Sequence, residues 1–145
     1  HAVGRRPLHD GPGFMISIVR LGSPRLPNEG LRLGTVRRPP RGVKKSDYAR
    51  LDYYDVWLPE LSPSPLLFSW MMGANITDPR WRNFARRYQA EMKKPEPQRL
   101  LALLAALSRQ TNLSVGCYCE NESRCHRSLL RELLQQQGAV MAQRG

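Results

Sequence analysis

The stretch VGCYCENESRCHRSLLRELL, residues 115–134, holds all three cysteines of the chain and one of its three histidines. Thiols and an imidazole this close together suit three kinds of chemistry. They are metal binding, nucleophilic catalysis by a thiolate, and anion binding by the helix that follows. Each of these functions requires a different spatial arrangement of Cys117, Cys119, Cys125 and His126. The arrangement predicted for these residues therefore decides among the three functions.

The metal interpretation rests on the ligand types, because three thiolates and one imidazole form a known zinc ligand set. However, Cys117 and Cys119 are expected two positions apart on one strand, which places them about 7 Å apart along the pleat. Structural zinc sites use C-x2-C pairs instead. From the sequence we therefore assign no metal and no cofactor, and we keep a Cys/His metal site as an alternative.

Catalysis by a cysteine needs a thiol of low pKa. Cys125 is expected near the start of the last helix, next to Arg124, His126 and Arg127, and such surroundings lower the pKa of a thiol. Tyrosine-phosphatase loops, however, place an arginine where this chain, counted from Cys119, has Cys125. The nucleophile stays an alternative beside a simpler one, in which the thiols pack as small apolar residues.

The anion-binding interpretation uses the position of this stretch. In open α/β sheets, ligands bind beyond the carboxyl ends of strands, where the free N–H groups of the next helix attract negative charge. We therefore predict a site for a phosphate- or nucleotide-type anion at the turn 119–127. Its predicted residues are Arg41, Cys119, Glu120, Cys125, His126 and Arg127. In the alternative, Arg127 pairs with a nearby glutamate and His126 is a surface residue.

Hydrophobic periodicity predicts the elements that position this site. Apolar and β-branched patterns predict strands over 14–22, 31–38 and 112–120. Apolar residues at three- and four-residue steps predict helices over 64–72, 78–94, 96–110 and 125–138. We also expect a short helix at 54–58 and one or two further strands within 39–60. This order of elements predicts an α/β fold: a small open sheet, mostly parallel, with helices packed on its faces.

The same periodicity predicts which side chains face the core. For the helices they are Trp81, Phe84, Ala85, Tyr88 and Met92, then Leu100, Leu103, Leu104 and Leu107, and finally Leu129, Leu130, Leu133 and Leu134. Trp57 is also expected in the core rather than as a platform on which a ligand stacks.

The composition is typical of one small globular domain, with 145 residues, 41% hydrophobic and 24% charged. We expect a single domain at 14–138, a flexible N-terminal arm at 1–13 and a C-terminal tail at 139–145. No apolar run approaches the roughly 20 residues of a membrane span, and the first residues lack the apolar segment of a signal peptide. We therefore expect a cytoplasmic protein with reduced thiols and no membrane partner.

The formal net charge of +11 comes from 19 arginines against 4 lysines. The planar guanidinium suits phosphate and carboxylate, so the expected partner is an anionic small molecule or a nucleic acid. A nucleic-acid-binding module that uses the arginines of residues 80–94 is the alternative function. Arginines spread along a chain are also typical of a solvated surface, and the sequence predicts no oligomeric state.

Four segments, in this order along the chain, resemble a known family: RLGTVRRPPRGV, LDYYDVWLPELSPSPLLFSWM, DPRWRNFARRYQAEM and CYCENESRCHRSLLRELL. Over residues 14–138 the chain is similar to the domain of unknown function 488 family, also called YeaO-like. The resemblance implies a small bacterial α/β protein with no settled activity, so enzyme status stays open. The PRG step at 40–42 and the CHR helix start at 125–127 match the family. Many members carry an acidic residue and a tryptophan where this chain has Arg37 and Pro39.

Overall fold

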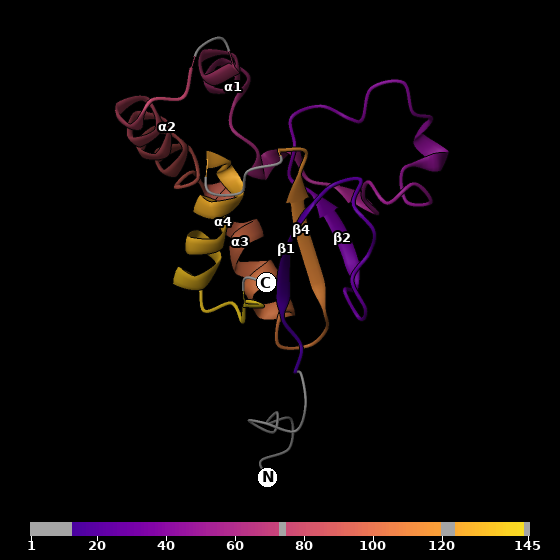
Figure 1. The fold of residues 1–145 in the computed structure, drawn as a ribbon. Coiled ribbons are helices and arrows are strands. Elements are labelled where there is room, and N and C mark those ends of the chain that lie inside the picture. Colours follow the sequence, from indigo (N-terminus) through magenta and orange to yellow (C-terminus); the bar gives the residue numbers. More distant parts are fainter. Residues whose placement is uncertain (1–12, 73–74, 120–123, 144–145) are drawn as a thin grey trace.

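A four-stranded sheet forms the centre of the fold (Figure 1). The computed structural model describes residues 13–72, 75–119 and 124–143. In this part of the chain the strand order is β1-β4-β2-β3, and every strand pair is parallel. The strands are β1 (Ile16–Arg20), β2 (Leu31–Gly34), β3 (Val56–Trp57) and β4 (Leu113–Cys117). The α/β fold and its three main predicted strands are confirmed, and the described sheet is wholly rather than mostly parallel.

The central strand β4 is buried at all five of its residues, because it lies between β1 and β2. Strands covered on both faces are usually continuous apolar runs. Ser114 departs from this pattern, but its hydroxyl donates to the Glu29 carboxylate and is satisfied without water. Gly116 is required by close packing, since a Cβ atom here would lie 2.6 Å from the Val19 carbonyl oxygen.

The structure contains the four predicted helices, with ends within three residues of the predicted ones. They are α1 (Pro65–Met72), α2 (Asp78–Glu91), α3 (Pro95–Leu107) and α4 (His126–Gln136). Figure 1 shows α3 and α4 on one side of the strands and the long segment between β2 and α1 on the other. Because β2 and β4 pair in parallel, their carboxyl ends lie at the same edge of the sheet.

The core stripe of α3 differs from the prediction by a small rotation. Leu103 is 54% exposed, whereas Leu101, which was not in the predicted stripe, is fully buried. The sequence LLALLAAL fits two apolar stripes that differ by one position, so periodicity alone does not select one. Predicted core residues that are buried in the structure are Phe84, Tyr88, Met92, Leu104, Leu129, Leu130, Leu133 and Leu134.

The short helix predicted at 54–58 is wrong. Val56 and Trp57 form β3 and pair with Leu33 and Gly34 of β2, so the further strand predicted within 39–60 is confirmed. Strand pairing provides backbone hydrogen bonds that a helix of this length largely lacks. Trp57 is 41% exposed rather than a core residue, and its indole N–H donates to the Val36 carbonyl oxygen at 2.7 Å.

A buried ion pair joins the turn before β2 to the sheet. Arg32 is fully buried and makes a two-pronged contact with Glu29, with Nε–Oε2 and Nη2–Oε1 distances of 2.7 and 2.8 Å. Its Nη1 donates to the carbonyl oxygens of Ser23 and Asp52. A charge pair removed from water stabilises a fold only when such additional hydrogen bonds satisfy it, and here both partners have them.

The described end of the chain belongs to the domain rather than to a separate tail. The Ile16 N–H donates to Val140 and the Ala142 N–H to Ile16, at 2.8 and 2.7 Å, so residues 140–142 cover the β1 edge of the sheet. Residues 1–12 of the predicted N-terminal arm lie outside the described residues. None of the helices described here combines the length and the apolar character that crossing a bilayer requires.

Candidate functional site

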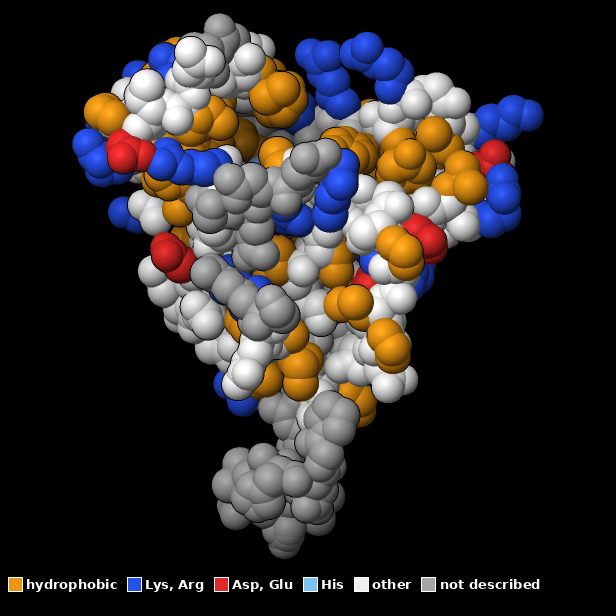
Figure 2. Space-filling view, in the orientation of Figure 1, with side chains coloured by type: hydrophobic (Ala, Val, Ile, Leu, Met, Phe, Trp, Pro, Cys, Tyr) orange, Lys and Arg blue, Asp and Glu red, His pale blue; other side chains and the backbone are white. Residues whose placement is uncertain are grey.

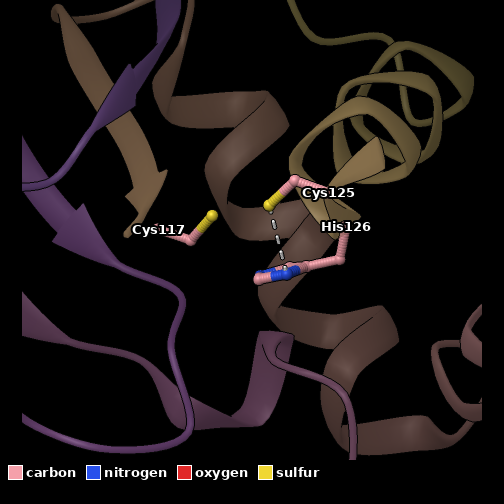
Figure 3. A group of neighbouring side chains, drawn as sticks. All are labelled: Cys117, Cys125 and His126. Atoms are coloured by element: carbon pink, nitrogen blue, oxygen red, sulfur yellow. Dashed lines mark hydrogen bonds between the residues drawn. The ribbon is translucent and has the colours of Figure 1, made fainter. Parts of the chain in front are cut away.

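Three side chains from β4 and α4 converge at the carboxyl end of the sheet (Figure 3). Cys117 is the last residue of β4, Cys125 is the N-cap of α4, and His126 is the first residue of that helix. Their two sulfur atoms and an imidazole nitrogen lie within 4.8 Å of one another, and all three residues are buried. We call these three residues the cysteine–histidine cluster.

Cys119 is not one of these three residues, because the strand predicted over 112–120 ends earlier, but its thiol hydrogen-bonds with those of Cys117 and Cys125. β4 stops at Cys117, the chain bends at Tyr118, and Cys119 is exposed. The spacing argument against a metal assumed that one strand keeps Cys117 and Cys119 apart, but the strand ends at Cys117 and the two thiols are hydrogen-bonded. Cys117 approaches Cys125 and His126, which come from the start of α4, and the distance along an extended strand does not limit that approach.

One hydrogen bond and one contact with a sulfur atom position the imidazole of His126. Its Nε2 lies 2.6 Å from the Thr35 carbonyl oxygen, and its Nδ1 lies 3.8 Å from the Cys125 sulfur. A carbonyl oxygen only accepts, so Nε2 carries the proton and Nδ1 presents its lone pair to the cluster. Burial lowers the pKa of His126 to about 4, so the ring is neutral near pH 7. With 9% exposure it is not the surface residue of the alternative interpretation.

The two buried cysteines hold their protons unequally. Hydrogen bonds from the thiols of Cys117 and Cys119 lower the pKa of Cys125, aided by the backbone and the charge of Arg127. Hydrogen bonds to the other two sulfurs raise the pKa of Cys117. The N-terminal end of a helix also favours negative charge. The cluster therefore favours a thiolate at Cys125 and a thiol at Cys117.

Arg127 directly follows the cluster in the first turn of α4 and is only 3% exposed. Its Nη1 donates to the Val19 carbonyl oxygen at 2.8 Å, and its Nη2 donates to the Cys119 carbonyl oxygen at 2.6 Å. These contacts join the end of β1 to the segment after β4. The guanidinium is thus directed at backbone oxygens, and the described contacts include no pairing of Arg127 with a glutamate.

The other predicted site residues are placed differently. Arg41 is exposed in the loop after β2, and no contact among the described residues joins it to the cluster. Glu120 lies outside the described residues. The structure therefore brings Cys119, Cys125, His126 and Arg127 together and leaves Arg41 apart. Cys117, which was not among the predicted site residues, is a full member of the cluster.

An apolar cavity of about 190 Å³ adjoins the cluster. It lies beyond the carboxyl ends of β2 and β4, and its lining residues come from the segments 36–38, 62–72 and 117–119 and from His126. Cys117, Cys119 and His126 form one wall, whereas Cys125 does not line it. Sequence reasoning missed this cavity because residues far apart along the chain build it.

Basic side chains surround this end of the molecule. Figure 2 shows Lys and Arg side chains over both the α2 side and the side that carries the segment after β2. Part of the surplus is used within the protein: Arg80 and Arg87 lie 3.9 and 4.8 Å from the centre of the Trp70 ring, and Arg124 pairs with Asp78. Some of the arginines therefore make contacts within the protein, and other basic side chains lie on its surface.

Comparison with known proteins gives one match. The family model DUF488-N3a, described as the active DUF488-N3 subclade, matches residues 16–138. This range contains every strand and helix from β1 to α4, and it includes the whole cysteine–histidine cluster. No curated protein and no solved structure matches the chain.

Proposed function

This chain belongs to the DUF488 family, and on that premise we propose that its cysteine–histidine cluster binds a divalent metal ion of the zinc type. The observation that carries the proposal is the approach of two sulfur atoms and an imidazole nitrogen to within 4.8 Å in a buried place. Two thiolates and an imidazole are a ligand set of catalytic zinc, which keeps its fourth position open.

The distances are close to those of a metal site. Zinc bonds of about 2.0–2.3 Å in a tetrahedron place the ligand atoms roughly 3.3–3.8 Å apart. The Cys125 sulfur and His126 Nδ1 are already 3.8 Å apart. All three ligand atoms lie within 4.8 Å of one another, so small side-chain movements would bring Cys117 into the same coordination sphere.

The surroundings of His126 also favour metal binding. A histidine that binds a metal usually donates its other ring N–H to a carboxylate or a backbone carbonyl, which fixes the tautomer and the ring orientation. Here Nε2 donates to the Thr35 carbonyl oxygen and leaves Nδ1 directed at the sulfur atoms. A ligand must also be deprotonated, and the lowered pKa values of His126 and Cys125 meet this condition.

The burial of Cys125 favours metal binding over the alternative in which a cysteine thiolate is a catalytic nucleophile. Cys125 is 3% exposed and does not line the cavity, so its sulfur suits a ligand better than a group that attacks a substrate. The predicted anion site at 119–127 stays a prediction, although the described donors of Arg127 and His126 are directed at backbone oxygens. The nucleic-acid alternative likewise stays a prediction. It requires affinity that falls steeply with salt concentration.

The test is metal binding by the full chain, purified without chelator and titrated with Co²⁺ as a spectroscopic substitute for Zn²⁺. We expect one equivalent, with the thiolate-to-cobalt charge-transfer absorption of a cysteine site. Cys125→Ser and Cys117→Ser should each weaken binding by more than about a hundredfold, because losing a ligand costs more than the 10–100-fold loss of an outer-shell partner.

Cys119→Ser is the comparison variant: it also removes one thiol, but this thiol is a hydrogen-bond partner of Cys117 and Cys125 and not one of the three residues that lie within 4.8 Å of one another. We expect it to retain the thiolate-to-cobalt absorption and to weaken binding by about 10–100-fold, the loss typical of an outer-shell partner and smaller than the loss of a ligand. Equal affinity of Cys125→Ser and the wild type, or a spectrum without the charge-transfer band, would refute the metal site. Loss of binding in Cys119→Ser would refute the three-ligand assignment.

A further inference from the structure

We propose that the cavity beside the cluster binds the planar ring of an aromatic anion, and that Arg38 at its rim binds the negative charge. This inference goes beyond the metal proposal and does not require an ion, because it rests on the size, the lining and the charge of the cavity. The cavity also lies beyond the carboxyl ends of two parallel strands, where ligands of open α/β sheets bind.

The volume sets the size of the ligand. An apolar cavity of about 150 Å³ holds a benzene molecule, and this cavity measures about 190 Å³. One ring with a small substituent therefore fits inside. A larger part of the ligand would have to remain outside, at the rim, where the exposed residues Arg38 and Met72 lie.

The walls favour an aromatic ring over other groups of that size. Three of the lining side chains are themselves rings, namely Phe68, Tyr118 and His126, and the neighbouring walls include Val36 and Pro63. Aromatic side chains pack against a further ring in edge-to-face or offset-stacked arrangements.

The two arginines at the rim have different surroundings. The Arg37 guanidinium donates to the carbonyl oxygens of Pro59 and Pro63, both at 3.1 Å, and so holds the wall. Arg38 is exposed, and its backbone carbonyl accepts a hydrogen bond from the Tyr118 hydroxyl at 2.9 Å. Its side chain therefore starts from a fixed point at the rim, and a guanidinium binds carboxylate or phosphate in a planar, two-pronged manner.

The test uses the full chain, both zinc-loaded and metal-free, with benzoate as the charged probe and benzyl alcohol as its neutral counterpart. Binding is followed by NMR titration of the backbone amides. We expect benzoate to shift the amides of Phe68 and Tyr118 in both forms. Arg38→Gln should weaken benzoate by at least about tenfold, the lower end of the range for one hydrogen bond to a charged group, and leave benzyl alcohol unchanged.

A pair of variants on α1 provides the control. Met72→Glu places a negative charge at the rim and should weaken benzoate about tenfold. Leu66→Glu adds the same charge on the same helix at a position that is 85% exposed and outside the lining, so it should have no effect. Both positions are exposed, which preserves the fold. Absence of benzoate shifts, or equal binding by Met72→Glu and Leu66→Glu, would refute the proposal.

Two further comparisons complete the test. If only the zinc-loaded protein binds benzoate, the claim that the cavity binds its ligand without a metal is refuted. If the protein binds benzoate but takes up no cobalt, the cavity proposal is upheld and the metal proposal is refuted. Uridine monophosphate is titrated in parallel, because a nucleotide offers the same combination of ring and charge. Tighter binding of this nucleotide assigns the site to nucleotides, and tighter binding of benzoate assigns it to aromatic carboxylates.

Discussion

Glu29→Gln is expected to lower the free energy of unfolding by about 3–5 kcal/mol, the range for removing one partner of a buried ion pair. The reason is that Arg32 stays fully buried and charged after the change. Its remaining acceptors are the new amide oxygen at position 29 and backbone carbonyls such as those of Ser23 and Asp52, and none of them carries a full negative charge. Urea denaturation followed by tryptophan fluorescence measures the loss.

Asp47→Asn is the matched control for this measurement. Asp47 and Arg50 form a second Arg–carboxylate pair of the same sequence spacing, but their side chains are 32% and 68% exposed. Exposed pairs contribute between about 0 and 1 kcal/mol, so the variant should unfold almost as the wild type does. Equal effects of Glu29→Gln and Asp47→Asn would show that burial does not determine the strength of the Glu29–Arg32 contact.

The same pair predicts a dependence of stability on pH. Burial alone would raise the pKa of Glu29, but hydrogen bonds from Arg32, Ser114 and the Leu26 N–H outweigh it, so the pKa lies below its ordinary value of 4.5. A lowered carboxyl pKa contributes stability above the ordinary value, and this contribution is lost as the pH falls through the folded-state pKa. The wild type and Glu29→Gln should therefore converge in stability in acid and differ most near neutrality.

Arg127→Met is expected to lower the free energy of unfolding by about 3–6 kcal/mol, because it removes two charged hydrogen bonds worth about 1.5–3 kcal/mol each. The carbonyl oxygens of Val19 and Cys119 would lose these donors in a place with little access to water. Arg127→Lys should recover part of the loss, since a single ammonium group does not reproduce the fork of the guanidinium. Denaturation curves of the three proteins give the comparison.

Arg82→Met serves as the reference, because Arg82 is an exposed arginine of α2. Its loss should change stability by less than about 0.5 kcal/mol. The anion-site prediction makes a different statement about Arg127, namely that its removal lowers affinity for phosphate. An unchanged unfolding free energy in Arg127→Met, together with lost phosphate binding, would contradict the structural role argued above.

The elements of the fold could be predicted because local signals define them. Apolar period, proline at the helix starts and glycine at turns are visible within short windows. The predictions are wrong where the local pattern fits two structures, or where pairing with a strand distant in the sequence determines the structure. In α3 two leucine stripes fit equally well, and burial selects Leu101 over Leu103. At Val56 and Trp57, pairing with β2 replaces the short helix.

The site could be predicted in residue type but not in arrangement. The consecutive residues Cys125, His126 and Arg127 indicated chemistry at the start of the last helix, where the structure adds Cys117 to Cys125 and His126. Which cysteine joins them depends on where β4 ends, and the strand pattern extended it past Cys117 to Cys119. The Thr35 carbonyl that fixes His126 lies 91 positions away in the sequence, so no local pattern could indicate it.

The Thr35 contact has a consequence for how the site tolerates variation. The atom that orients His126 is a main-chain oxygen, and every amino acid provides one. Thr35→Val would remove the hydroxyl that donates to Gly116 but would keep the oxygen that faces the imidazole. The residue at position 35 can therefore change its side chain without removing the hydrogen bond to His126. The requirement is that the backbone keeps the same path, so that the main-chain oxygen still faces the imidazole.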